Sequence, residues 1–195
     1  SKGDSLYSIA RKFGVSPTEL SYINALSDPD RLTIGQTLVI PGGSAPQGQI
    51  EVNGYAYPNI SDTVLSEALP YMTFLCPFSW HIDVAGGITP VDDKRMISRA
   101  YETATAPMLT LTNIGTSGGF SSDIAHAIFT DDAAQTTLID NILAALRSRG
   151  YYGVNLNIEY VYPFDRAGYN AFLKKLSETL HPKGYYLTSA IAPKT

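Results

Sequence analysis

One segment, residues 153–161, constrains the fold more than any other, because it alternates strictly between apolar and polar side chains. In a β-strand, successive side chains point to opposite faces. The apolar side chains, which would share one face, are Val154, Leu156 and Ile158. The polar side chains, which would share the other face, are Asn155, Asn157 and Glu159. The segment therefore predicts a strand with one polar face that ends in a carboxylate.

The polar face of this strand favours a closed barrel over an open sheet. A parallel strand covered by helices on both faces is normally apolar on both. Two amides and a carboxylate buried there would cost several kcal/mol unless they were hydrogen-bonded. In a barrel they would point inward, with Glu159 nearest the C-terminal opening, where barrel active sites lie. The alternative is an edge strand with a hydrated polar face, and the long helices predicted on either side of it argue against that.

The order of the other elements after residue 49 also predicts an α/β fold. We expect five strands, at residues 50–57, 71–78, 108–114, 153–161 and 185–191. The clearest helices are residues 131–149, with Thr130 as a cap, and residues 165–181, because each carries one apolar stripe. Alternation of strands and helices indicates a parallel sheet with helices outside, in the strand order 1-2-3-4-5.

The N-terminal 41 residues are predicted to form a separate small α+β unit. Leu6, Ile9, Ala10 and Phe13 fall at helical spacing, and Ser16-Pro17 begins a second short helix. Residues 37–40 read as a short strand. Residues 42–49 contain no charged and no large apolar side chain, which is typical of a linker.

Composition excludes several classes of function. The net charge is −4, so nucleic acid is not an expected partner. No apolar run approaches the roughly 18 residues of a membrane span. The single cysteine, Cys76, excludes a disulfide framework and reads as a small buried apolar residue. The three histidines are widely separated, and there is no phosphate-binding loop, so we expect no metal and no cofactor.

The N-terminal segment resembles a LysM module. The resemblance covers nearly all of residues 1–41 and runs through residues 2–10, Phe13-Gly14-Val15-Ser16, and residues 35–41. It implies binding of glycans that contain N-acetylglucosamine, as in peptidoglycan or chitin. The implied sugar-binding residues are Gly3, Asp4, Ser5, Leu6, Leu26, Ser27, Asp28 and Pro29. Asp4 and Ser5 also read as helix caps, and the two roles are compatible.

Residues 50–195 resemble the N-terminal part of glycoside hydrolase family 18, in particular its LysM-bearing spore-germination and cortex-lytic subgroup. The resemblance runs through residues 52–55, 78–80, 107–113, 153–159 and 184–194. It implies a (β/α)8 TIM barrel, of which the chain would hold the first five strands. It also implies that Glu159 is the proton donor, with Asn155 and Asn157 at the alternating signature positions before it.

Two departures from the family pattern bear on activity. The family has aspartates where this chain has Asn155 and Asn157, and the second of them orients the substrate's acetamido group. A complete barrel takes about 250 residues, whereas residues 50–195 number 146. We therefore expect a chain of this length to be inactive by itself, with an apolar inner face and an open strand edge that allows self-association.

The sequence leaves three functions open. The first is a retaining, substrate-assisted N-acetylglucosaminidase that acts on peptidoglycan or chitin, in which one carboxylic acid suffices. The second is an inactive, lectin-like glycan-binding protein, which the Asn155 and Asn157 pair favours. The third is a structural spore-coat or wall protein. Each implies an extracellular, cell-wall or spore-coat location.

Three further side chains are candidates for substrate binding. Tyr57 and Trp80 lie near the C-terminal ends of their predicted strands and could stack on sugar rings, although each also reads as a core or rim aromatic residue. Asn113 ends the third predicted strand and is assigned to substrate binding through the family resemblance.

Overall fold

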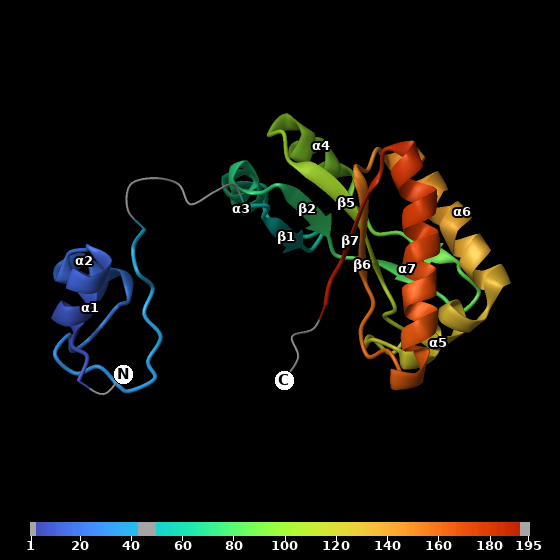
Figure 1. Cartoon of the computed structure of the whole chain (residues 1–195). Helices are drawn as coiled ribbons and strands as arrows, with labels where there is room; N and C mark the ends of the chain where they lie inside the picture. The colour runs from blue at the N-terminus through green and yellow to red at the C-terminus, as the bar shows by residue number, and fades with distance from the viewer. Residues whose placement is uncertain (1–2, 43–49, 192–195) are drawn as a thin grey trace. The chain divides into compact units, whose positions relative to one another are not determined.

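The computed structural model describes residues 3–42 and 50–191 (Figure 1). The chain divides into two compact units, with the boundary between Ile50 and Glu51. All but the first residue of the predicted linker at 42–49 lies outside the described residues.

The N-terminal unit contains two short helices, as the sequence predicts. Helix α1 spans Leu6–Phe13; the Ser5 hydroxyl accepts from the Ser8 N–H, and the Ser8 hydroxyl accepts from the Ser5 N–H. This reciprocal pair satisfies two of the backbone donors that a helix start leaves open. Helix α2 spans Pro17–Ile23. Its Leu20 packs with Leu6 and Ala10 of α1 to form the core of the unit.

The prediction of a strand at residues 37–40 is wrong. The backbone of this segment is hydrogen-bonded to a side chain and not to a neighbouring strand. The Nδ2 of Asn24 donates to the carbonyl of Val39 at 2.8 Å, and the Val39 N–H donates to Asn24 Oδ1 at 2.7 Å. The same Nδ2 also donates to the Leu20 carbonyl. One side-chain amide therefore holds the segment against the end of α2 without a β-ladder.

The second unit contains a curved sheet whose five central strands follow chain order. They are β1 (Asn53–Ala56), β2 (Phe74–Pro77), β5 (Ala106–Thr112), β6 (Gly153–Asn157) and β7 (Tyr186–Ser189). Each is parallel to the next, in the order β1-β2-β5-β6-β7. The predicted parallel order is confirmed.

Two short strands were not predicted. Strand β3 (Trp80–Ile82) follows β2 after two residues and pairs in parallel with the C-terminal part of β5. Strand β4 (Ile88–Thr89) pairs with β3 in antiparallel fashion. Beyond the two-residue break, β3 takes the place of β2 beside β5, so this antiparallel pair leaves the order of the five parallel strands unchanged.

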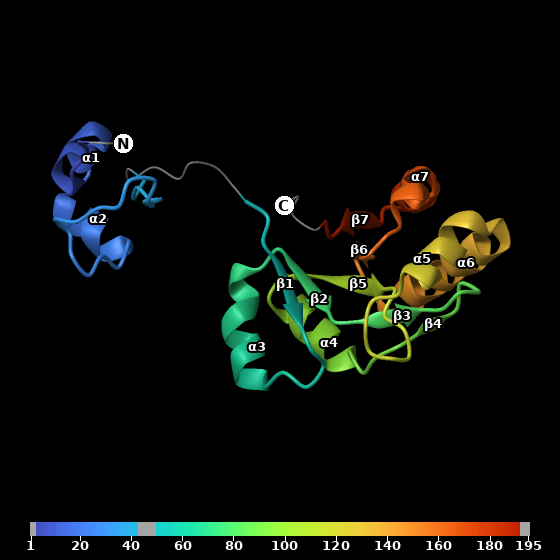
Figure 2. The same cartoon turned by 90° about the horizontal axis from the view of Figure 1, so that it is seen from below.

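Five helices lie along the outer side of the arc of strands (Figure 2). They are α3 (Asp62–Ala68), α4 (Lys94–Glu102), α5 (Ser122–Thr130), α6 (Asp132–Arg149) and α7 (Arg166–Leu180). Short 3-10 turns occupy Leu69–Tyr71, Pro163–Asp165 and His181–Lys183. The two predicted helices correspond to α6 and α7. Thr130 is the last residue of α5 rather than the cap of α6, since Asp131 accepts from the Ala133 and Ala134 N–H groups.

The largest core lies between the sheet and helices α5 to α7. The apolar residues of the alternating strand, Val154, Leu156 and Ile158, are buried in it. They share the core with Leu138 and Ile142 of α6 and with Phe172 of α7. The apolar face of β6 therefore points outward to the helices, and its polar face points into the arc.

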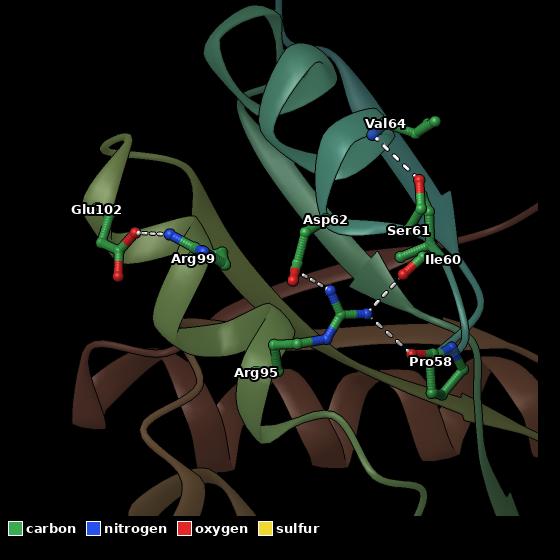
Figure 3. A network of polar contacts seen from close by, with 8 residues as sticks. All are labelled: Pro58, Ile60, Ser61, Asp62, Val64, Arg95, Arg99 and Glu102. Carbon is green, nitrogen blue, oxygen red and sulfur yellow. Dashed lines mark hydrogen bonds and ion pairs between the residues drawn. The ribbon is translucent and has the colours of Figure 1, made fainter.

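The loop that follows β1 is tied to α4 through Arg95 (Figure 3). The guanidinium donates to the carbonyls of Pro58 and Ile60 at 3.1 and 2.6 Å, and it pairs with Asp62 at the start of α3. Because Pro58 follows Tyr57 directly, these bonds fix the chain just beyond that candidate site residue.

A buried carboxylate, Asp93, joins the start of α4 to the end of α6. It is fully buried and accepts from the indole N–H of Trp80 at 2.6 Å and from the Tyr151 hydroxyl. Arg149 donates to it at 3.1 Å and lies 5.4 Å from the Trp80 ring. Three donors, one of them a cation, thus compensate the desolvation of this carboxylate.

This cluster predicts a stability change at alkaline pH. Burial, followed by the hydrogen bond to Asp93, raises the pKa of the Tyr151 hydroxyl. The folded state thus holds this proton more tightly than the unfolded chain, so the stabilisation is complete below pH ~10 and declines above it. Tyr151→Phe should cost about 1–3 kcal/mol at pH 8 and should flatten the decline above pH 10.

Urea denaturation between pH 8 and 11 measures both effects. Tyr71→Phe, at a tyrosine that is 82% exposed, is the matched control and should keep the parent slope. Equal slopes for the parent and Tyr151→Phe would contradict the assignment.

Candidate active site

The polar face of β6 is hydrogen-bonded to side chains of the first and the last of the five parallel strands. The Tyr55 hydroxyl of β1 donates to Asn155 Oδ1 at 2.9 Å. Asn155 Nδ2 in turn donates to Thr188 Oγ1 of β7, also at 2.9 Å. Asn155 is 3% exposed, and its amide therefore links the first and last strands of the arc across its inner side. Both polar atoms of the Asn155 side chain are therefore engaged in hydrogen bonds within the protein.

The prediction of an apolar inner face is wrong for the part of the sheet around the polar face of β6. Its buried polar residues are Ser79, Thr110, Thr112, Asn155 and Asn157. The Ser79 and Thr112 hydroxyls lie 3.0 Å apart and share a hydrogen bond. Aromatic rings lie further toward the N-terminal ends of the strands, where the Phe74, Tyr152 and Tyr186 rings are 5.0 to 6.3 Å apart. Polar groups thus line the end that faces the candidate catalytic residue.

Cys76 also lies within the sheet. It is fully buried, and burial raises the pKa of its thiol to about 12. A thiol that keeps its proton at neutral pH is a poor nucleophile, which agrees with its interpretation as a small buried residue.

Asn157 carries a buried acceptor without a partner. The residue is 6% exposed, and its Oδ1 accepts no hydrogen bond from any described residue. Buried side-chain polar atoms in proteins nearly always have a partner, so an exception needs an explanation. The pleat puts Asn157 on the same face as the position of Glu159, two residues on. A ligand N–H that reached this oxygen would satisfy it.

Asn113 holds the backbone of Glu159 from the end of β5. The Asn113 side chain is fully buried; its Oδ1 accepts from the Glu159 N–H at 3.0 Å, and its Nδ2 donates to the Glu159 carbonyl at 2.8 Å. The Nδ2 also donates to the Ser121 carbonyl at 2.9 Å. Both polar atoms of the amide are occupied by the protein. Asn113 therefore positions Glu159, and its predicted direct contact with substrate is replaced by this role.

Two tyrosines lie at the C-terminal end of β1, and the first of them, Tyr55, is near Glu159. Burial raises the pKa of the Tyr55 hydroxyl, and the nearby negative charge of Glu159 acts in the same direction. Tyr57 is 65% exposed, with its ring 5.6 Å from Phe78 at an angle of 76°. Tyr57 therefore presents an exposed ring surface just beyond β1, as a sugar-stacking residue must.

Trp80 does not join this group. It is 5% exposed, it packs in the core against the helices, and its indole N–H donates to Asp93. Its ring has no free face on which a sugar could stack, so we do not propose Trp80 as a substrate-binding residue. The sequence does not distinguish a core position from a sugar-stacking position for Trp80, because an aromatic side chain near a strand end can point to either face of the sheet.

In the N-terminal unit, an open groove brings together half of the residues predicted to bind glycan. Ser5, Leu6, Leu26 and Pro29 line it. Gly3 and Asp4 line neighbouring hollows, and Ser27 and Asp28 line none of them. Asp28 instead accepts from the Asp30 N–H at 3.1 Å, which shapes the loop.

The same groove contains aromatic residues that the sequence analysis missed. Tyr7 and Tyr22 line it and are 66% and 85% exposed. Both lie off the apolar positions of their helices, and a tyrosine outside the apolar stripe is the sequence signal that could have identified them.

Two kinds of feature are absent from residues 3–42 and 50–191. No group of three or more His, Cys, Asp or Glu side chains there is arranged to hold a metal ion. None of the helices in that range has the length and apolar character needed to cross a membrane.

Comparison with known proteins identifies the first unit. Residues 1–41 match the family model of the LysM domain. The first 41 residues are a LysM domain. The groove lined by Ser5, Leu6, Leu26 and Pro29 is thus a groove of this domain.

The whole chain is similar to enzymes that degrade spore cortex. The cortical fragment-lytic enzyme of Bacillus subtilis is 32% identical over 249 residues, which covers 100% of this chain and 57% of that protein. The crystal structure of the Bacillus cereus spore cortex-lytic enzyme SleL superimposes with a TM-score of 0.73 at 32% identity, over 100% of this chain and 46% of that one.

A more distant structure supports the fold alone. A chitinase from Chromobacterium violaceum gives a TM-score of 0.65 at 22% identity, over 73% of this chain and 46% of that one. The resemblance to LysM-bearing, chitinase-like cortex-lytic enzymes is confirmed, and so is the α/β TIM-barrel fold class. This chain spans about half the length of these relatives.

The Asn113 clamp predicts a loss of stability on substitution. Asn113→Ala removes the partner of both backbone groups of Glu159 and should destabilise the fold by about 1–3 kcal/mol. Asn113→Asp is the sharper variant, since it keeps an acceptor for the N–H but turns a donor into an oxygen facing two carbonyls. Chemical denaturation checks both, and a loss under ~0.5 kcal/mol for both variants would show that the clamp is unimportant.

Proposed function

We propose that the protein is a peptidoglycan-directed glycoside hydrolase of the retaining N-acetylglucosaminidase type. The observation that carries the proposal is the unpartnered, buried Oδ1 of Asn157, two residues before Glu159 on the same strand face. The acetamido N–H of an N-acetylated sugar is a donor that would satisfy this oxygen. The relatives are named as enzymes that lyse spore cortex, and these names favour peptidoglycan over chitin as substrate.

In the proposed reaction, Glu159 donates a proton to the leaving glycosidic oxygen. The substrate's own acetamido carbonyl oxygen attacks the anomeric carbon as the bond to the leaving oxygen breaks, so a second protein carboxylate is not required. Glu159, now ionised, takes a proton from the water that opens the cyclic intermediate and restores the acid. Two displacements at the same carbon retain its configuration. Asn113 keeps the Glu159 backbone at the strand end throughout.

A lectin-like function is the second candidate, and Asn157 itself favours it. A carboxylate at this position would stabilise the positive charge that develops on the cyclic intermediate, whereas a neutral amide contributes only a hydrogen bond. Binding would persist under this alternative while turnover would be very slow. Under either function the LysM domain would hold the protein on the cell wall or spore.

Substitution of Glu159 and Asn157 in the full-length protein tests the proposal. Glu159→Gln should abolish hydrolysis of peptidoglycan fragments and retain binding, because glutamine keeps the shape but cannot donate the acid proton. Asn157→Asp should raise kcat, by roughly tenfold or more, through charge stabilisation. Hydrolysis that survives Glu159→Gln unchanged would remove Glu159 from the mechanism. An inactive parent that Asn157→Asp fails to activate would favour the lectin.

A LysM variant provides the control for these measurements. Tyr22→Ala alters the exposed ring in the LysM groove and should reduce retention on insoluble peptidoglycan. It should leave the rate of hydrolysis of soluble fragments unchanged, since no residue of the second unit, which contains Glu159, is altered.

A further inference from the structure

A group of exposed aromatic rings lies on the segment that follows Glu159. Tyr160 is 74% exposed and Phe164 is 71% exposed. Their neighbours Phe120 and Tyr162 are partly exposed. The segment between β6 and α7 bonds to the start of α5, beyond the C-terminal end of β6 (Figure 1). These four rings, with His126 of α5, are called the rim surface below.

The backbone of Tyr160 is held in an unfavourable conformation. Its φ is +55°, in the left-handed region, which is costly for a residue with a side chain. The Ser122 hydroxyl donates to its carbonyl, and the preceding residue is the one that Asn113 clamps. The Tyr160 ring thereby lies 6.3 Å from the Phe120 ring, at 42° to it. Such strain persists where the surroundings hold it in place, and it is frequent at ligand sites.

The other half of the rim surface is built around a buried carboxylate. Asp165 is 4% exposed, and both of its oxygens lie within 3.0 Å of His126 Nδ1. The imidazole is half-exposed and contacts the stacked rings of Tyr162 and Phe164 edge-on. Its Nε2 takes part in no hydrogen bond with the described residues. A buried carboxylate thus fixes the orientation of a half-exposed imidazole among aromatic rings.

The chemistry of the rim surface fits a neutral carbohydrate. Aromatic rings stack on the C–H faces of a pyranose, and an imidazole nitrogen bonds its hydroxyl groups. Residues 113–126 and 159–165 contain no Lys or Arg and carry the carboxylates Asp123, Glu159 and Asp165. A phosphate or another anionic ligand would be repelled there.

We propose that the rim surface is a subsite for a sugar ring of the glycan whose glycosidic bond meets Glu159. This inference rests on the proposed function, because it takes the same glycan as the occupant. Tyr160 and Phe120 supply the stacking surface, and His126, oriented by Asp165, supplies the polar contact. Tyr160 directly follows Glu159 in the chain, and this makes a neighbouring ring of the same glycan the occupant.

A fluorescence reporter at Tyr160 tests this directly. The chain has a single tryptophan, Trp80, which is buried, so Tyr160→Trp adds an exposed reporter to a constant background. Titration of the full chain with N-acetylchitohexaose should change its emission saturably. The matched control is Tyr71→Trp, at an exposed tyrosine that precedes β2 at the opposite end of the sheet, and its emission should not change. Soluble peptidoglycan fragments form a second arm and should give the same response.

Second substitutions in the Tyr160→Trp background separate this subsite from the LysM domain. Phe120→Ala and His126→Ala should each raise the titration midpoint roughly three- to tenfold. Tyr22→Ala in the LysM groove should leave it unchanged. A flat emission up to millimolar glycan, or a midpoint that responds to Tyr22→Ala alone, would overturn the subsite.

The outcomes are independent of the hydrolysis assay. If Glu159→Gln abolishes hydrolysis while the reporter stays silent, the rim subsite is wrong and the hydrolase proposal stands. If the reporter responds in a protein that hydrolyses no glycan, the rim subsite stands and the hydrolase proposal fails.

Discussion

The side-chain amide of Asn113 bonds both the N–H and the carbonyl of Glu159, and the geometry of the candidate active site depends on this pair of bonds. Strand β5 ends at Thr112 and β6 at Asn157, so both partners lie just beyond the regular ladder. Without the amide, the two backbone groups of Glu159 would lack these partners at the point where the chain turns out of the sheet. The clamp fixes the start of the loop that carries Tyr160, and with it the rim surface.

The LysM domain uses the same device in a different setting. Asn24 bonds the N–H and the carbonyl of Val39 with one amide, and it thereby replaces a strand partner. An asparagine side chain carries one acceptor and two donor hydrogens, so it can imitate a neighbouring strand over a single residue. In both units, therefore, an amide fixes a segment that no ladder holds. Asn155 likewise uses its amide to bond two partners, the side chains of Tyr55 and Thr188, across the inner side of the sheet.

Periodicity predicted the parts of the fold that burial controls. The alternation in β6 placed Val154, Leu156 and Ile158 against the helices, and the apolar stripes of α6 and α7 placed those two helices. Helices α3, α4 and α5 have nine residues or fewer, and β3 and β4 have three and two, too few for a period to show.

The site was harder to predict than the fold, because it depends on which group each polar atom meets. Asn113 lies at a strand end that the sequence marked, but its partner is 46 residues away and is a backbone group. Trp80 was misassigned because its partner, Asp93, lies in a loop without a pattern. Hydropathy gives no sign that the oxygen of Asn157 lacks a partner while the amide of Asn155 is fully used.

The central claim is that Asn157 receives the acetamido group of the substrate, and a thermodynamic cycle tests it most directly. Binding of an N-acetylated chitooligosaccharide and of a counterpart that carries hydrogen in place of each acetamido group would be measured for Glu159→Gln with and without Asn157→Ala, in a Tyr22→Ala background. This counterpart has no hydrogen-bond donor at that position, whereas a deacetylated sugar would still offer its ammonium N–H to Asn157 Oδ1. The account predicts that Asn157→Ala weakens binding of the acetylated sugar about tenfold and leaves the other unchanged. Equal effects on the two sugars would contradict it.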